Sequence, residues 1–118
     1  MTRRKKTALR STDQLMRELV MLKNDPALVD EFYLHAIQGI ADAQYGLGLI
    51  YAEGRGTEED LVKSFAWLTL CSIGGDEDAK MLRQVVAERM SEQDVQASLA
   101  YADELKQTIA DNKVILLK

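Results

Sequence analysis

The sequence predicts an all-α fold built from pairs of short helices. Residues 40–76 contain two stretches with apolar residues at helical spacing, separated by glycines. The chain has one proline and no long alternation of apolar and polar residues of the kind that marks strands. A shift of 36 residues aligns Asp42-Ala43 with Asp78-Ala79 and His35 with Cys71, and this length is typical of helix-pair repeats. At 118 residues we expect a single domain.

The first two helices have recognisable starts. Ser11-Thr12-Asp13-Gln14 has the form of a capping box, which opens a helix that we expect to end near Lys23. Asn24-Asp25-Pro26 then opens the next helix, with proline at a tolerated first position. Three leucines follow the first capping box on one face: Leu15, Leu19 and Leu22.

The helix pair at residues 40–75 has the clearest pattern. Its first half mixes small and apolar residues at helical spacing, so that one face can approach a neighbouring helix closely. These residues are Ala43, Gly46, Leu47, Gly48, Ile50 and Tyr51. Gly54 and Gly56 end this helix, because glycine enters left-handed conformations at little steric cost. Residues 57–60 supply cap-like and acidic side chains for a second helix, which ends at Gly74-Gly75. The face of that second helix contains Leu61, Phe65, Leu68 and Ser72.

Two more helices are predicted after this pair. Asp76 begins a helix, and Ser91-Glu92-Gln93-Asp94 is a second capping box that opens a long final helix. We expect the final helix to stop at Asp111-Asn112, so that residues 112–118 form an apolar tail. The apolar face of the earlier helix is Ala79, Leu82, Val86 and Met90, and that of the final helix is Val95, Leu99, Ala102, Leu105 and Ile109.

With the residues laid out this way, the pair at about 40–75 resembles the Sel-one-like repeat family, a branch of the tetratricopeptide-like helical solenoids. The matching positions are Ala43, Leu47, Gly48, Tyr51, Gly54, Gly56, Asp60, Lys63, Ala66, Trp67 and Gly75. Cys71-Ser72 departs from the small pair that the family usually carries after its tryptophan. The resemblance implies a short right-handed α-solenoid of about three antiparallel helix pairs. Only one repeat is complete, and divergent half-repeats and a capping helix flank it within residues 11–111.

The residues do not predict catalysis. His35 and Cys71 are the single histidine and the single cysteine, and they occupy equivalent positions one repeat apart. Stacked units separate such positions by on the order of 10 to 20 Å, too far for a hydrogen bond, so we expect both to be packing residues. One histidine with one cysteine cannot close a tetrahedral metal site, and Glu58-Glu59-Asp60 is better explained as a helix cap. We therefore expect no enzyme activity, no metal and no cofactor.

Charge is unevenly distributed along the chain. The first ten residues hold five of the 15 Lys and Arg residues, while all 19 Asp and Glu residues lie in the remainder. A basic leader of this kind can be an arm for nucleic acid, an anionic membrane or an acidic partner. We favour a solvated, disordered leader over residues 1–10, because the acidic body would repel phosphate and no aromatic residues interleave with the arginines. The basic residues are Arg3, Arg4, Lys5, Lys6 and Arg10.

Membrane insertion and export are not predicted. Residues 1–10 lead into no apolar run of signal-peptide length. The chain also has no stretch of about 18 apolar residues. We expect a cytoplasmic protein.

In the related solenoids the first helix of each pair lines a concave groove, and the resemblance places ten groove positions in this chain. They are Asp42, Tyr45, Leu49, Ala52 and Glu53, with Asp78, Met81, Val85, Glu88 and Arg89 one repeat later. Such an apolar strip with charged ends suits a peptide or amphipathic helix that carries basic residues. The alternative is that some of these residues are core, because helical periodicity alone does not separate a concave face from a packed one.

The apolar tail offers a second contact. Four consecutive apolar residues either fold back over the last helix pair or dock into the groove of a second copy and form a homodimer. They are Val114, Ile115, Leu116 and Leu117.

The sequence therefore favours a non-catalytic adaptor or regulator that binds a protein or peptide in its groove. The first alternative is a structural accessory subunit of a homo-oligomer or larger complex. A nucleic-acid-associated factor that uses the basic leader is a weaker alternative, and nucleic acid is not an expected partner.

Overall fold

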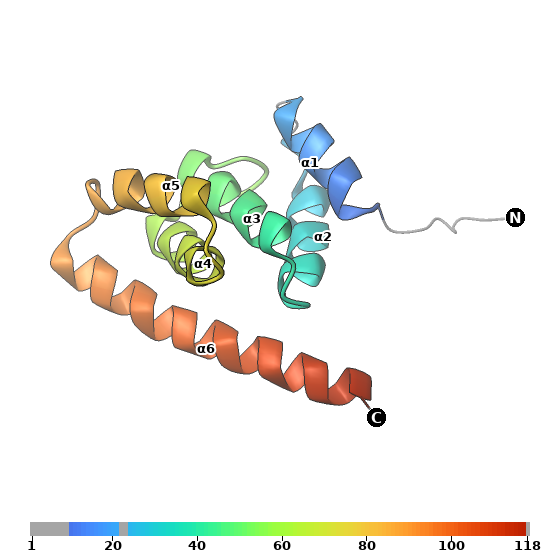
Figure 1. Ribbon diagram of the computed structural model, residues 1–118. Coiled ribbons are helices and arrows are strands. Elements are labelled where there is room, and N and C mark those ends of the chain that lie inside the picture. Colours follow the sequence, from blue (N-terminus) through green and yellow to red (C-terminus); the bar gives the residue numbers. More distant parts are fainter. Residues whose placement is uncertain (1–9, 22–23, 118) are drawn as a thin grey trace, which may run out of the picture.

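The computed structural model of the chain describes residues 10–21 and 24–117, with the backbone alone for residues 114–117. Within these ranges it contains helices and turns and no strand, so the prediction of an all-α fold is confirmed (Figure 1). The helices are α1 (Thr12–Val20), α2 (Pro26–Ala36), α3 (Ala41–Glu53), α4 (Leu61–Ile73), α5 (Glu77–Ala87) and α6 (Glu92–Leu117).

The helix starts follow the predicted caps. The Ser11 hydroxyl accepts a hydrogen bond from the Gln14 backbone N–H, and the Gln14 side chain accepts one from the Ser11 N–H. Ser91 and Asp94 make the same reciprocal pair before α6, at 3.0 and 3.5 Å. Because each cap satisfies N–H groups that the first turn leaves free, these residues fix where the helices begin. The carboxylates that cap α2, α4 and α5 belong to Asp25, Asp60 and Asp76.

Glycines let α3 pack closely on its neighbours. A Cβ atom at Gly46 would lie 2.3 Å from the Phe32 ring of α2, and one at Gly48 would lie 2.5 Å from the Leu68 side chain of α4. Both distances are shorter than those that real Cβ atoms show, so glycine permits this approach without displacement of either side chain. Gly54 ends α3 in the left-handed conformation, with φ of 69°, as predicted.

α3 and α4 form the middle of the molecule. α1 and α2 pack against α3, while α5 and α6 both pack against α4 (Figure 1). A first core cluster joins α1, α2, α3, α4 and α6 around Phe32 and Trp67. A second cluster joins α4 and α5 and contains Phe65, Leu68, Cys71, Ala79 and Val86. α4 contributes to both clusters and so connects the two ends of the molecule.

The final helix is longer than predicted. α6 continues through Asp111-Asn112 to Leu117, so the expected stop is wrong. The Asn112 side chain donates a hydrogen bond of 3.3 Å to the Ile37 carbonyl in the turn after α2, which joins the far end of α6 to that turn. Val114, Ile115, Leu116 and Leu117 are helical in backbone, and their side chains lie outside the described part of the chain.

The buried face of α6 also differs from the prediction at one position. Leu99 is 37% exposed, whereas Ser98 is fully buried. The Ser98 hydroxyl donates to the Val62 carbonyl at 2.7 Å, so a serine close to α4 takes the place expected for a leucine. Ala102 and Leu105 are buried as expected.

The basic leader is described only at its last residue. The Arg10 guanidinium donates to the carboxylates of Glu31 in α2 and Glu18 in α1, so this residue is held against the helices. Residues 1–9 lie outside the described residues, as do Leu22 and the predicted end of the first helix near Lys23. α1 itself ends at Val20.

Candidate functional site

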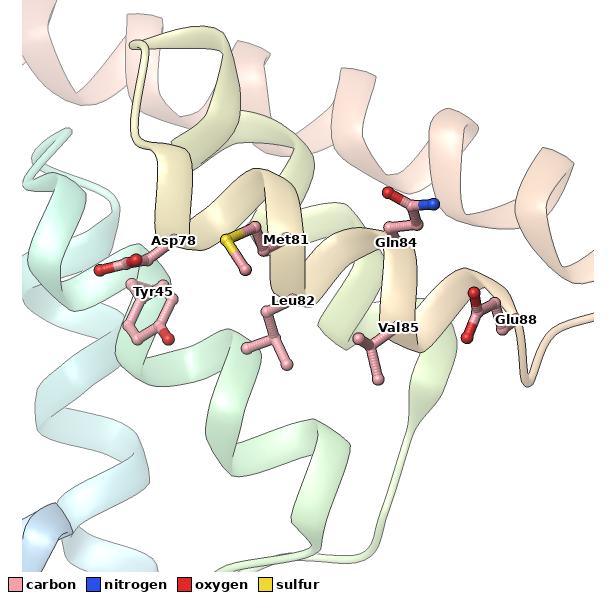
Figure 2. A pocket seen from close by; sticks show the side chains of 7 residues that line it. All are labelled: Tyr45, Asp78, Met81, Leu82, Gln84, Val85 and Glu88. Carbon is pink, nitrogen blue, oxygen red and sulfur yellow. The ribbon is translucent and has the colours of Figure 1, made fainter.

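A hollow of about 450 Å³ lies between α3 and α5. Figure 2 shows that Tyr45 forms one wall of it, while side chains along α5 form the other wall. The lining residues are Tyr45, Asp78, Met81, Leu82, Gln84, Val85 and Glu88.

The middle of the hollow is apolar. Tyr45 and Leu82 are partly buried and pack against the second core cluster, so the floor of the hollow is continuous with the core. Met81 and Val85 stand above this floor and are 68% and 55% exposed. Folding thus leaves a methionine and a valine in water beside an apolar depression, which is typical of a surface that another molecule covers.

The two ends of the hollow are acidic. Asp78 lies beside Tyr45 at one end, and Glu88 lies beyond Val85 at the other (Figure 2). Within the described ranges, neither carboxylate has an ion-pair partner. Burial, and then the negative charges of Asp78 and Asp76, raise the pKa of the Tyr45 phenol. The phenol therefore remains a neutral hydrogen-bond donor at physiological pH.

Half of the ten predicted groove residues line this hollow: Tyr45, Asp78, Met81, Val85 and Glu88. The other five do not. Leu49 packs against the first core cluster and Ala52 against the second, because α3 is covered on several sides. Glu53 forms an ion pair with Arg55 at 2.8 Å, and Arg89 forms one with Glu59 at 3.1 Å. Asp42 is exposed in the first turn of α3.

Two lining residues were not predicted as groove positions. Leu82 was assigned to the apolar face of its helix, and it does contact the core, but one edge of it also forms the floor of the hollow. The one sequence feature that could have indicated this role is its position next to Met81, a predicted groove residue. Gln84 is exposed, and no feature of the sequence marks it.

Of the two residues considered for catalysis, Cys71 belongs to the second core cluster, while His35 is half-buried and hydrogen-bonded. The His35 ring nitrogen Nδ1 is 2.8 Å from the Thr12 hydroxyl. Cys71 is buried, and its thiol donates to the Ala41 carbonyl at 3.4 Å. Burial, followed by the charge of Asp76, raises the pKa of the Cys71 thiol to about 12, which disfavours a thiolate nucleophile. Among the residues with described side chains, no three His, Cys, Asp or Glu groups are placed to hold a metal ion.

The residues assigned to structural repeat positions are buried, half-buried or at turns in the structure. Tyr51 is half-buried, with the Lys63 ammonium 5.4 Å from its ring centre. Gly54, Gly56 and Gly75 have positive φ angles. The fully buried members are Ala43, Leu47, Gly48, Ala66 and Trp67.

A second apolar depression lies on α1. It has a volume of about 370 Å³ and is lined by Met16, Arg17, Val20 and Met21. Val20 and Met21 are 75% and 71% exposed. Its lining contains no acidic residue, whereas the lining of the hollow beside α5 contains Asp78 and Glu88.

None of the described helices combines the length and apolarity needed to cross a membrane. No protein-family model matches the chain, and a search of curated proteins finds no match either. The likeness to Sel-one-like repeats therefore stays a prediction from the residues.

Proposed function

We propose that this chain is a non-catalytic protein–protein interaction module, an adaptor or regulator that binds a short peptide or helix in the hollow between α3 and α5. We further propose that its helices form a short right-handed solenoid of the Sel-one-like type. The pairs would be α1 with α2 and α3 with α4, while α5 would begin a divergent third unit whose last helix, α6, packs on α4 as a cap. The residue pattern at 40–75 and the close glycine contacts of α3 support this assignment.

The exposure of Met81 and Val85 above an apolar floor is the observation that carries the binding proposal. Full burial of such a side chain contributes roughly 1.5–3 kcal/mol, so covering both provides a substantial part of the affinity of a short peptide. The acidic ends at Asp78 and Glu88 then favour basic residues in the partner. This arrangement of an apolar middle and acidic ends supports recognition of a partner.

A permanent interface is the second candidate, and the depression on α1 favours it. Val20 and Met21 are more exposed than Met81 and Val85, and they lie at the opposite end of the helix order. An accessory subunit would cover this surface in its complex. The partner-binding hollow and this surface can be tested separately, because they share no residue.

Affinity capture from an extract of the native host tests the binding proposal. The bait is the full chain, beside a Met81→Ser/Val85→Ser variant and an Ile73→Ser control. Ile73 is also exposed and apolar, at 66%, but it does not line the hollow. We expect a partner that wild type and the control retain and that the double variant loses. Equal retention by all three would contradict binding in this hollow.

A further inference from the structure

The exposed face of α5 carries a regular pattern. Asp78, Met81, Val85 and Glu88 are separated by three, four and three positions. This spacing places them in one row along a helix, and all four side chains are exposed. The row therefore reads acidic, apolar, apolar, acidic.

An apolar row with this spacing matches the packing of one helix against another. Side chains spaced by three and four residues fit into the spaces between side chains of a facing helix. α5 satisfies its own backbone hydrogen bonds, so it offers no free N–H or C=O row for an extended strand to join. The row thus favours a helical partner over an extended peptide.

The distance between the acids sets the length of that partner. Asp78 and Glu88 are ten residues apart, which corresponds to about 15 Å along a helix. A facing helix must therefore place its basic residues about three turns apart. The order of acidic and apolar residues is the same from either end of the row, so the charges favour neither a parallel nor an antiparallel partner helix. Tyr45 lies at the Asp78 end alone (Figure 2).

We infer that the partner of the α3–α5 hollow is an amphipathic helix of about three turns, in which two apolar residues are flanked by Lys or Arg at positions i and i+10. The apolar residues stand at i+3 and i+7, facing Met81 and Val85. This inference rests on the proposed function and adds the conformation and charge spacing of the partner.

Synthetic helical peptides test the inference with the full chain. The flanked peptide carries Lys at i and i+10 and Leu at i+3 and i+7 in an alanine and glutamine background. A shifted peptide has the same composition with both lysines on the opposite face, and a proline peptide has proline at its centre. Binding is followed by fluorescence anisotropy of labelled peptide at low and high salt.

We expect the flanked peptide to bind about tenfold more tightly than the shifted peptide at low salt, from two ion pairs of roughly 0.7 kcal/mol each. The difference should shrink at high salt, and the proline peptide should bind more weakly than the flanked one. An Asp78→Lys/Glu88→Lys variant should prefer a peptide with Glu at both ends. Circular dichroism confirms that each variant is folded.

Other outcomes overturn the inference in distinguishable ways. Equal binding of the flanked and shifted peptides, still lost in Met81→Ser/Val85→Ser, would refute the charge spacing while leaving the hollow as a binding site. Equal binding of the proline peptide would refute the helical conformation. Failure of every peptide would refute the inference, while affinity capture would still test the proposed function.

Discussion

Gly48 determines how closely α3 and α4 pack. The space where its Cβ would stand is filled by the Leu68 side chain, and the Ser64 hydroxyl donates to the Gly48 carbonyl at 2.7 Å. Ser64 is fully buried, so this hydrogen bond forms in a region without water. A side chain at residue 48 would therefore displace the Leu68 side chain from the space that it fills.

Replacing this glycine should therefore destabilise the fold. Gly48→Ala should lower the free energy of unfolding by about 1–3 kcal/mol through overpacking, despite the preference of roughly 1 kcal/mol for alanine within a helix. Urea denaturation measures the change. A Gly48→Ala/Leu68→Ala double variant should lose less stability than the two single variants lose together, because Leu68→Ala opens the space that the new methyl group needs. Full stability of Gly48→Ala would contradict the close contact.

Residue patterns predicted this close approach but misplaced some neighbours. Small residues at helical spacing indicate where backbones approach, and Gly46 and Gly48 lie there. Leu49 and Ala52 were assigned to the groove because they lie between the structural positions of the repeat that the sequence resembles. α3 is packed on several sides, so periodicity alone could not show that these two residues contact the core.

Asp60 fixes the start of α4. Its carboxylate accepts a hydrogen bond of 3.0 Å from the Lys63 backbone N–H. The neighbouring Glu58 is exposed and lies before the cap. The cluster Glu58-Glu59-Asp60 is thus explained by one capping residue, with Glu59 paired to Arg89.

Loss of this cap should cost measurable stability. Asp60→Ala should lower the free energy of unfolding by about 1 kcal/mol, while Asp60→Asn, which retains a capping oxygen, should lose much less. Thermal unfolding followed by circular dichroism measures both. Glu58→Ala is the matched control and should change little. A control as destabilised as Asp60→Ala would show that general acidity, and not the cap, matters here.

The end of α6 shows why element boundaries are harder to predict at C-termini. Asp111 and Asn112 favour turns when considered alone, because their side chains compete with the backbone for hydrogen bonds. In the structure, Asn112 instead bonds to the Ile37 carbonyl, and α6 packs along α4. A contact between residues so far apart in sequence leaves no local signal, whereas caps such as Ser11 and Ser91 are local and were predicted correctly.

α4 links the two core clusters of the whole molecule. Trp67 belongs to the first cluster and Cys71 to the second, and they are four residues apart on the same helix. α6 also packs on α4, and it reaches both clusters, because Leu105 belongs to the first and Val95 packs against the second. The molecule should therefore unfold as one unit.

Two probes on α4 test this cooperativity. The fluorescence of Trp67 and the reaction of the Cys71 thiol with a thiol reagent should report the same urea midpoint. In the native state at pH 8 the thiol should react at least about a hundredfold more slowly than in the unfolded chain, because burial keeps it protonated. If the Cys71 thiol becomes reactive at a lower urea concentration than the one at which the Trp67 fluorescence changes, the α5 end opens independently.

The central claim is that the hollow between α3 and α5 is the surface that binds a partner. Mapping amide chemical-shift changes by NMR during titration with the flanked peptide tests it most directly. The account predicts that the largest changes fall at Tyr45 and along residues 78–88, and that Met81→Ser/Val85→Ser abolishes them. Changes centred on Met16, Val20 and Met21 of the α1 end, with α5 unaffected, would contradict it.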